Sequence, residues 1–298
     1  MRLAVTGRNG QVVQSLLERA PADVEIVTLA RPEFDLQDAG AVAQAIAAAR
    51  PHAVVSAAAY TAVDLAETDS EQAYRINEAG AGAVAAVAGR LGIPVVHLST
   101  DYVFDGGLAR RYREDDVPAP LGVYGASKLA GERAVAAANP DHAILRTAWV
   151  YSPFGKNFVR TMLTLAESRD DISVVCDQRG APTCALDLAD GIITVVRNLL
   201  ARPDEAALRG LFNMTSSGET DWAGFAEAIF ACSAAAGGPS ARVKRIATSD
   251  YPTPARRPAN SRLDSARLAE RHGVRLPDWK HSLASCVDRL LAAGRVNH

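Results

Sequence analysis

A tyrosine and a lysine stand four residues apart in the stretch YGASK, Tyr124 to Lys128. On a helix, this spacing places both side chains on one face. A phenol is a weak proton donor because its ordinary pKa is about 10, and a nearby ammonium group lowers that pKa by favouring the phenolate. The pair is therefore a candidate general acid or base near neutral pH, although ordinary surface helices also carry this spacing.

A strand that ends in hydroxyl groups precedes this helix. The run IPVVHLST closes with Ser99 and Thr100, and the carboxyl ends of parallel strands face the ligand cleft of an open α/β sheet. A hydroxyl in that place can hold a carbonyl oxygen and share the charge that develops on it. We therefore predict Thr100, Tyr124 and Lys128 as the catalytic residues.

A glycine-rich turn follows the first predicted strand, in RLAVTGRNGQVVQSLLE. Its two glycines allow a tight turn, and the free N–H groups of the following helix can hold a phosphate. The spacing is G-x-x-G, with Val13 where a third glycine is expected, so the motif alone also fits an ordinary strand–helix turn. The predicted cofactor contacts at this turn are Gly7, Arg8, Asn9, Gly10, Gln11 and Val12.

The end of the second predicted strand indicates which dinucleotide binds. An acid there would hold a ribose 2′-hydroxyl and favour NAD, but VEIVTLARPEFD reaches Arg31 first, and Arg8 lies in the glycine-rich loop. Two guanidinium groups suit a 2′-phosphate, so we expect NADPH, with NADH possible; the alternative is that both arginines face solvent. Asp35 could contact the adenine or cap the next helix. Further predicted cofactor contacts are Asp35, Leu36, Ala57, Ala58 and Ala59.

The elements that must position these residues alternate strand and helix through the first half of the chain. Continuous apolar runs such as HAVVSAAA alternate with alanine-rich stretches such as AGAVAQAIAAAR. This pattern is typical of buried parallel strands joined by right-handed helical crossovers. We predict an α/β fold, a doubly wound parallel Rossmann sheet that binds the cofactor, formed by residues 1–155, to which residues 184–205 return. Residues 156–298 are predicted to form a smaller α/β substrate-binding domain.

Composition and charge exclude several classes of protein. The 298 residues are 48% hydrophobic and carry a net charge of −2, so a large core can form and no broad basic field is available for nucleic acid. The chain begins with strand-like residues, without the pattern of a signal peptide, and no apolar run reaches about 20 residues. The four cysteines have no zinc-site or redox spacing. We expect a soluble cytoplasmic protein that does not enter a membrane.

Six motifs in series resemble a known family. They are AAAYTAVDLAE, LSTDYVFDG, YGASKLAGE, LRTAWVYSPFGKNFV, DQRGAPT and RPANSRL. The chain resembles the extended short-chain dehydrogenase/reductase family and, within it, the dTDP-4-dehydrorhamnose reductases. The resemblance implies reduction of the 4-keto group of dTDP-6-deoxy-L-lyxo-4-hexulose to dTDP-L-rhamnose by NADPH, the last step of dTDP-rhamnose biosynthesis. Tyr124 would protonate the nascent alkoxide, Lys128 would lower the tyrosine pKa and bond the nicotinamide ribose, and Thr100 would hold the carbonyl oxygen.

The resemblance also implies contacts to a dTDP-sugar substrate. These are Thr61, Val63 and Asp64 near the sugar, Thr100 at its carbonyl, Trp149 over its ring, and Asn157, Gln178 and Arg262 near the nucleotide. For Trp149, ordinary core packing is the alternative. A guanidinium can pair with a diphosphate, but Arg256, Arg257 and Arg262 crowd one loop, and the sequence does not distinguish among them.

One departure from the family pattern concerns assembly. Some relatives form a magnesium-bridged dimer through glutamates, one of them early in the first helix, where this chain has Ser15. Magnesium usually needs a carboxylate anchor, so Mg²⁺ is doubtful, no metal ligand is assigned, and we expect a monomer or a weak homodimer. Two other functions stay open: another nucleotide-sugar reductase or an epimerase, and a non-catalytic NADP-binding regulatory subunit.

Overall fold

A computed structural model describes residues 1–295 of the chain. Its centre is a six-stranded parallel sheet in the order β10-β5-β4-β3-β1-β2. The strands are β1 (Arg2–Thr6), β2 (Glu25–Leu29), β3 (Ala53–Ser56), β4 (Val95–Thr100), β5 (His142–Thr147) and β10 (Gly210–Asn213). The strand order reverses between β1 and β3, where open α/β sheets bind their ligands.

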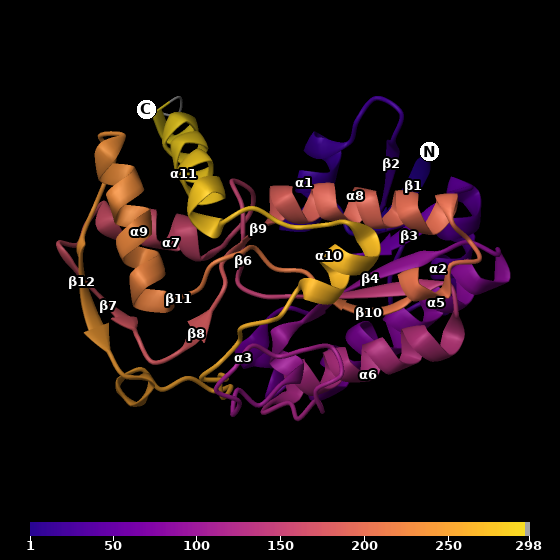
Figure 1. Cartoon of the computed structure of the whole chain (residues 1–298), viewed down its shortest axis with the longest axis horizontal. Helices are drawn as coiled ribbons and strands as arrows, with labels where there is room; N and C mark the ends of the chain where they lie inside the picture. Colours follow the sequence, from indigo (N-terminus) through magenta and orange to yellow (C-terminus); the bar gives the residue numbers. More distant parts are fainter. Residues whose placement is uncertain (296–298) are drawn as a thin grey trace.

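Helices cover both faces of this sheet (Figure 1). One face carries α1 (Gln11–Arg19) and α8 (Ala185–Ala201), whose Leu16 and Ile192 share a core with strand residues. The other face carries α2 (Ala39–Ala49), α5 (Ala81–Arg90) and α6 (Val123–Ala138), packed through a second core. Apolar residues on both sides explain why the strands read as continuous apolar runs. The predicted doubly wound parallel sheet is confirmed.

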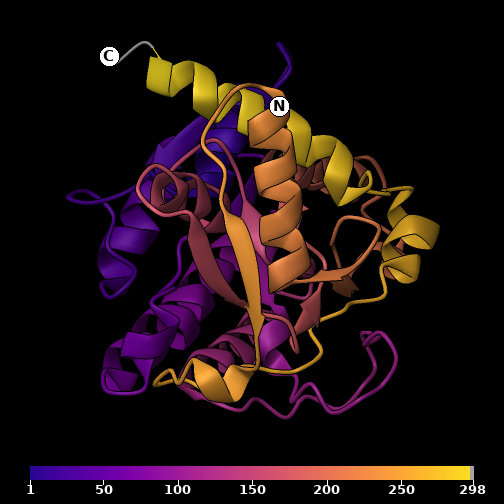
Figure 2. The ribbon, with the colours of Figure 1, turned by 90° about the vertical axis from the view of Figure 1, so that its left-hand side faces the viewer.

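A second lobe stands beside the sheet, at the left of Figure 1. It consists of α7 (Phe158–Ala166), α9 (Trp222–Ala235) and α11 (Trp279–Arg295) around the parallel pair β7 (Asp171–Val175) and β12 (Arg242–Ile246). Figure 2 shows this pair with α9 beside it. The helices and strands bury their own apolar core, which includes Phe225, Ile229 and Leu283.

Short elements connect the two lobes. The paired strands are β6 (Val150–Tyr151) with β9 (Thr183–Cys184), and β8 (Arg179–Gly180) with β11 (Thr220–Asp221). The remaining helices are α3 (Val63–Ala66), α4 (Ser70–Tyr74), α10 (Ala266–His272), the π-helix Arg75–Gly80, and the 3₁₀ turns Asp101–Val103, Ala206–Leu208 and Thr248–Asp250. None of the helices in residues 1–295 combines the length and the hydropathy that a membrane crossing requires.

Candidate active site

The predicted catalytic hydroxyls meet where β4 ends and α6 begins. Thr100 is the last residue of β4, and Tyr124 lies in the first turn of α6. A glycine makes this approach possible, because a Cβ at Gly125 would stand 2.1 Å from the carbonyl oxygen of Tyr102. The rings of Tyr102 and Tyr124 pack edge to face, with centroids 5.5 Å apart. The sequence motifs STDYVFDG and YGASK thus form one site, and Tyr124 keeps part of its surface exposed.

The pKa of Tyr124 differs from the sequence-based expectation. Burial raises the pKa of this phenol to about 12, and a hydrogen bond with Thr100 opposes the rise only in part. Desolvation of the phenolate is the largest cause of this rise in pKa, and the charge of Asp101 adds to it. The expected lowering by Lys128 is not seen. Tyr124 is therefore a neutral phenol near neutral pH and carries a proton that it can donate.

Lys128 is buried beneath the site, with 3% of its surface exposed. Its ammonium group donates a hydrogen bond to the Leu98 carbonyl oxygen at 2.7 Å, and its Nζ lies 3.4 Å from His97 Nε2. Burial lowers the pKa of Lys128 to about 8, while the charge of Glu132 acts in the opposite direction. The lysine therefore carries a charge that is lost just above neutral pH.

Asp101 is a site residue that the sequence analysis missed. It is buried, and its Oδ1 accepts a hydrogen bond from the Thr100 hydroxyl at 3.0 Å. Burial raises the pKa of this carboxyl to about 6, while hydrogen bonds from Ser261 and Thr100 act to lower it. The available signal was its place: an acid that directly follows an apolar strand at the ligand edge of the sheet.

A cavity of about 190 Å³ opens at the carboxyl ends of β1, β2 and β3. Its lining includes predicted cofactor residues, namely Gly7, Arg31, Asp35, Leu36, Ala58 and Ala59. The Arg31 side chain is 70% exposed, and its Nε lies 3.6 Å from Asp35 Oδ2. Asp35 accepts a hydrogen bond from the Gln37 backbone, whereas Asp38 caps α2. The alternative of Asp35 as the helix cap is therefore wrong.

The other residues of the glycine-rich turn have varied surroundings. Arg8, Asn9 and Gly10 are exposed, whereas Val12 packs against the core beneath α1. Gln11 bridges the lobes: its amide donates to the Val150 carbonyl at 3.3 Å and accepts from the Ser152 hydroxyl at 2.8 Å. Its side chain thus has protein partners, and its cofactor contact stays a prediction.

Backbone hydrogen bonds and close packing hold the residues around the cavity at the ends of β1, β2 and β3. The backbone N–H groups of Ala57 and Ala58 donate to the Thr6 hydroxyl at 3.0 and 2.9 Å. Val13, which replaces the expected glycine, is buried, and its Cγ2 would lie 3.4 Å from a Cβ placed on Gly7. Val13 therefore fills the space between α1 and the glycine-rich turn. It is not among the residues that line the cavity.

The loop arginines point to different partners. Arg257 donates to Asp64 Oδ2 at 2.8 Å, which lowers the pKa of Asp64, and the Ala255 backbone donates to the same carboxylate. Arg262 instead donates to Glu219, Asn260 and the Ala109 carbonyl. Arg257 therefore contacts the predicted sugar loop through Asp64. In that loop Thr61 is exposed and Val63 begins α3. Arg262 instead holds the segment around Ala109. Both diphosphate assignments stay predictions.

Trp149 has an unusual backbone conformation and a stacked partner. Its φ is 49°, a region that residues other than glycine rarely adopt. Its ring stacks on Trp222 with centroids 3.7 Å apart and an interplanar angle of 12°. A Cβ on Gly180 would stand 2.4 Å from the Trp149 ring, so only glycine fits there. Trp222, the first residue of α9, was missed because a lone tryptophan in a helical pattern gives no signal of function.

The two remaining substrate candidates have protein partners in the second lobe. Asn157 caps α7 by accepting from the Arg160 backbone at 3.2 Å, and its amide donates to the Ser152 carbonyl at 2.8 Å. Gln178 is buried and donates to the Thr248 hydroxyl at 3.0 Å. The polar groups of both residues are thus bonded within the protein, and their nucleotide contacts stay predictions.

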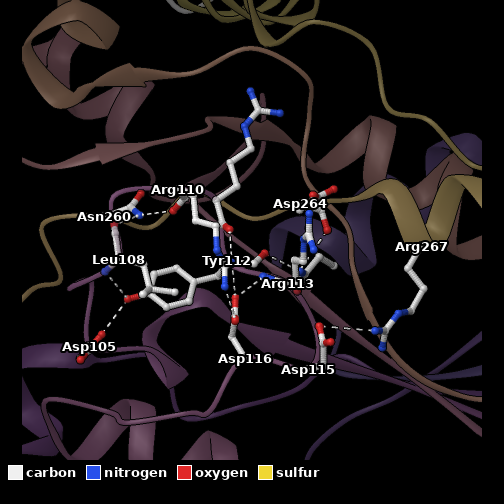
Figure 3. Close-up of polar contacts among 12 residues, drawn as sticks. Asp105, Leu108, Arg110, Tyr112, Arg113, Asp115, Asp116, Asn260, Asp264 and Arg267 are labelled. Atoms are coloured by element: carbon white, nitrogen blue, oxygen red, sulfur yellow. Dashed lines mark hydrogen bonds and ion pairs between the residues drawn. The ribbon is translucent and has the colours of Figure 1, made fainter.

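The loop that joins the two catalytic motifs is held by the C-terminal segment (Figure 3). Asn260 donates to the carbonyls of Leu108 and Arg110, both at 2.7 Å. Within the loop, the Tyr112 hydroxyl donates to Asp105 at 2.6 Å, and its ring stacks on Phe104. Residues 105–116 are therefore fixed between the strand that carries Thr100 and the helix that carries Tyr124.

The described residues include no group of three His, Cys, Asp or Glu side chains arranged to hold a metal ion. Ser15, which stands at the position of a magnesium-binding glutamate in some relatives, is buried and donates to the Gln11 carbonyl at 2.8 Å. The Ser15 hydroxyl thus has its hydrogen-bond partner within α1. The expectation that Mg²⁺ does not bridge a dimer here stays a prediction.

Comparison with known proteins agrees with this geometry. A family model described as RmlD substrate binding domain matches residues 1–292. A dTDP-4-dehydrorhamnose reductase of Sinorhizobium fredii is 50% identical over 295 residues, 99% of either chain. The namesake enzyme of Escherichia coli K12 is 42% identical over 88% of this chain and 87% of its own. The crystal structure of the Bacillus anthracis enzyme in complex with NADP is 34% identical, has a TM-score of 0.88 and covers 96% of this chain and 98% of its own. The chain therefore belongs to the RmlD family of dTDP-4-dehydrorhamnose reductases.

Proposed function

We propose that this chain reduces the 4-keto group of dTDP-6-deoxy-L-lyxo-4-hexulose to dTDP-L-rhamnose with NADPH. It is an oxidoreductase of the extended short-chain dehydrogenase/reductase type and performs the last step of dTDP-rhamnose biosynthesis. The observation that carries this conclusion is the 50% identity to a dTDP-4-dehydrorhamnose reductase over 99% of both chains. The residues proposed for such a reduction are all present in this chain: Thr100 ends β4, and Tyr124 and Lys128 lie in the first half of α6.

The residues at the carboxyl ends of β1 to β3 fit a dinucleotide. Gly7, Ala58 and Ala59 leave a cavity of about 190 Å³ with no bulky side chain from these positions, and Arg31 at its edge can meet a 2′-phosphate. NADPH, when bound, supplies the hydride that reduces C4 of the sugar. We infer that the turn Gly7–Gly10, with Arg8 and Asn9, holds the pyrophosphate through backbone N–H groups.

The chain's own groups then handle the proton and the charge. The Thr100 hydroxyl holds the carbonyl oxygen, and the Tyr124 phenol donates its proton to that oxygen as negative charge develops there. The buried ammonium of Lys128 stabilises the phenolate that is left behind. Because burial in the protein raises the pKa of Tyr124 to about 12, the phenol keeps its proton until the alkoxide forms.

We infer that residues from both lobes place the substrate. We infer that Trp149, held against Trp222 and Gly180, presents its ring to the sugar. Asp64 with Arg257, and the more distant Asn157, Gln178 and Arg262, are proposed to surround the rest of the dTDP-sugar. A direct test is incubation of the protein with NADPH and the 4-keto sugar nucleotide, with absorbance and product analysis. A protein that consumes no NADPH would contradict the proposed function.

The rate of reduction is expected to fall as the pH rises through about 8. Lys128 has a pKa lowered to about 8, so its ammonium is present below that pH and is lost above it. The measurement is kcat/KM for the sugar between pH 6 and pH 10 at saturating NADPH. A rate that stays constant to pH 9.5 would show that the charge of Lys128 is not needed.

Arg31→Ala is expected to raise the Kd for NADPH by roughly 10-fold and to leave the Kd for NADH nearly unchanged. Loss of one charge-assisted hydrogen bond to the 2′-phosphate accounts for that change. Fluorescence titration with both cofactors measures it. Arg202→Ala is the matched control, since Arg202 pairs with Glu205 on the surface directly after the end of α8. Equal weakening of both cofactors by Arg31→Ala would contradict the assignment.

Oligomeric state and location stay predictions. We infer a monomer or a weak homodimer, on the ground that Ser15 replaces the glutamate of magnesium-bridged relatives. Sedimentation velocity with and without Mg²⁺ tests this directly.

A further inference from the structure

A buried polar row lies behind the catalytic helix and ends at Lys128; no step of the proposed reaction uses its other two members, Ser56 and His97. His97 is in the middle of β4 with 1% of its surface exposed, and Ser56 is its register partner at the end of β3. His97 Nδ1 lies 3.0 Å from the Ser56 hydroxyl, and Nε2 lies 3.4 Å from Lys128 Nζ. The row therefore connects two strands of the sheet to α6 through one imidazole ring.

The chemistry of the lysine decides which ring nitrogen carries the proton. An ammonium group has three N–H donors and no acceptor. A proton on His97 Nε2 would place two donors face to face in a buried site, so Nε2 must be the acceptor while Lys128 is charged. The ring proton then lies on Nδ1, and the Ser56 hydroxyl accepts it. Lys128 thus sets the tautomer of His97, and the Ser56 hydroxyl accommodates it as an acceptor.

The donors of Lys128 are accordingly divided. One N–H goes to the Leu98 carbonyl at 2.7 Å, and a second is directed at His97 Nε2. We propose that His97, held between Lys128 and Ser56 as the Nδ1–H tautomer, is a positioning residue that orients the Lys128 ammonium and leaves one N–H free for the catalytic site. The inference rests on the proposed function, in which that ammonium faces Tyr124 and the cofactor.

Charged groups on the neighbouring elements are compatible with this role. Glu132, one turn beyond Lys128 on α6, is paired with Arg146 of β5 and favours the ammonium. Burial lowers the pKa of His97 well below its ordinary value, and the charges of Lys128 and His142 add to the effect. On the side of the catalytic hydroxyls, the charge of Asp101 raises the pKa of Tyr124. The imidazole therefore stays neutral, as an acceptor must.

The tautomer can be observed without any turnover. In protein labelled with ¹⁵N at histidine, the NMR signals of His97 are identified by their loss in His97→Asn. At pH 7, we expect a neutral ring with the proton on Nδ1 and a bare Nε2. A proton on Nε2, or on both nitrogens, would overturn the proposal. This result does not depend on which sugar is reduced, so it is separable from failure of the proposed function.

Two variants separate positioning from packing. The His97→Gln amide oxygen can reach the place of Nε2 and accept from Lys128, whereas the shorter His97→Asn amide reaches only toward Ser56. We expect His97→Asn to lose kcat on the order of 10-fold, to bind NADPH more weakly, and to move the alkaline fall in activity to lower pH. The shift has this sign because removal of an acceptor destabilises the ammonium and lowers the pKa of Lys128.

His97→Gln is expected to keep the alkaline limb and the NADPH affinity close to those of the unmodified protein. Thermal melts of both variants are measured alongside, since a purely structural role would lower both melting temperatures without separating the pH profiles. Equal loss of activity and affinity in the two folded variants, or an unchanged alkaline limb in His97→Asn, overturns the proposal. If neither variant folds, the tautomer in the unmodified protein decides between the outcomes, with the His97 signals identified by exclusion from single variants of the other five histidines.

Discussion

Replacement of Tyr124 by phenylalanine is expected to lower kcat for the keto sugar by roughly 10²–10⁴-fold, the usual contribution of a positioned general acid. Phenylalanine keeps the ring that packs edge to face on Tyr102 at 5.5 Å, so the helix and the cleft should keep their shape. The loss is therefore one of proton donation alone. The measurement is single-turnover reduction, followed by NADPH absorbance at pH 7.

NADPH binding provides the control for this variant. Tyr124→Phe should bind NADPH within a few-fold of the unmodified protein, because only one hydroxyl has been removed. Tyr74→Phe, on the exposed face of α4, is the matched substitution and should leave kcat unchanged. Turnover of Tyr124→Phe within a few-fold of the unmodified rate would remove the acid assignment.

Arg146→Met is expected to destabilise the protein by about 3–5 kcal/mol, the usual cost of breaking a buried ion pair. The Arg146 guanidinium, 2% exposed, donates to both oxygens of Glu132 at 2.8 and 2.6 Å, and Ser99 donates to the same carboxylate at 2.5 Å. Without the arginine, the Glu132 charge stays buried and uncompensated. Urea unfolding at pH 7, followed by circular dichroism, measures the loss.

A surface ion pair of similar geometry serves as the control. Arg242 donates to Asp171 at 2.6 Å, but its side chain is 76% exposed, so Arg242→Met should cost less than about 1 kcal/mol. The double variant Glu132→Leu with Arg146→Met should recover much of the stability, because two apolar side chains leave no buried charge. Similar losses for Arg146→Met and Arg242→Met would show that burial does not govern the pair.

A strand of the sheet could be predicted where its residues form a continuous apolar run in the sequence. β1, β3, β4 and β5 are buried along nearly their whole length, and such strands are recognisable in the sequence as continuous apolar runs. The edge strand β2 is mostly half-buried, with only Leu29 buried. β10 has only four residues, GLFN, and its place beside β5 depends on the crossover through α8. Such a short strand is specified by its neighbours in space, and no local pattern reveals it.

The site divides in a similar way. Thr100, Tyr124 and Lys128 could be proposed from the sequence because they belong to motifs with a fixed spacing, and their catalytic roles stay predictions. The direction of the Tyr124 pKa shift could not be found, because desolvation depends on what packs around the ring. The partner of Asp64 was equally hidden, since Arg257 lies 193 residues away in the chain. Trp222 and His97 gain their significance only from the rings and charges that the fold brings to them.

The anchoring of residues 105–116 by Asn260 limits how this enzyme can be recombined. The segment belongs to the first lobe by sequence. Its path into the helix of Tyr124 is nevertheless set by Asn260, in the last fifth of the chain, whose side-chain amide donates to two carbonyl groups of the segment. A chimaera that grafts only the C-terminal half of a relative would separate the segment from its matched anchor. A transplant aimed at a new sugar would therefore have to move residues 105–116 together with residues 260–267.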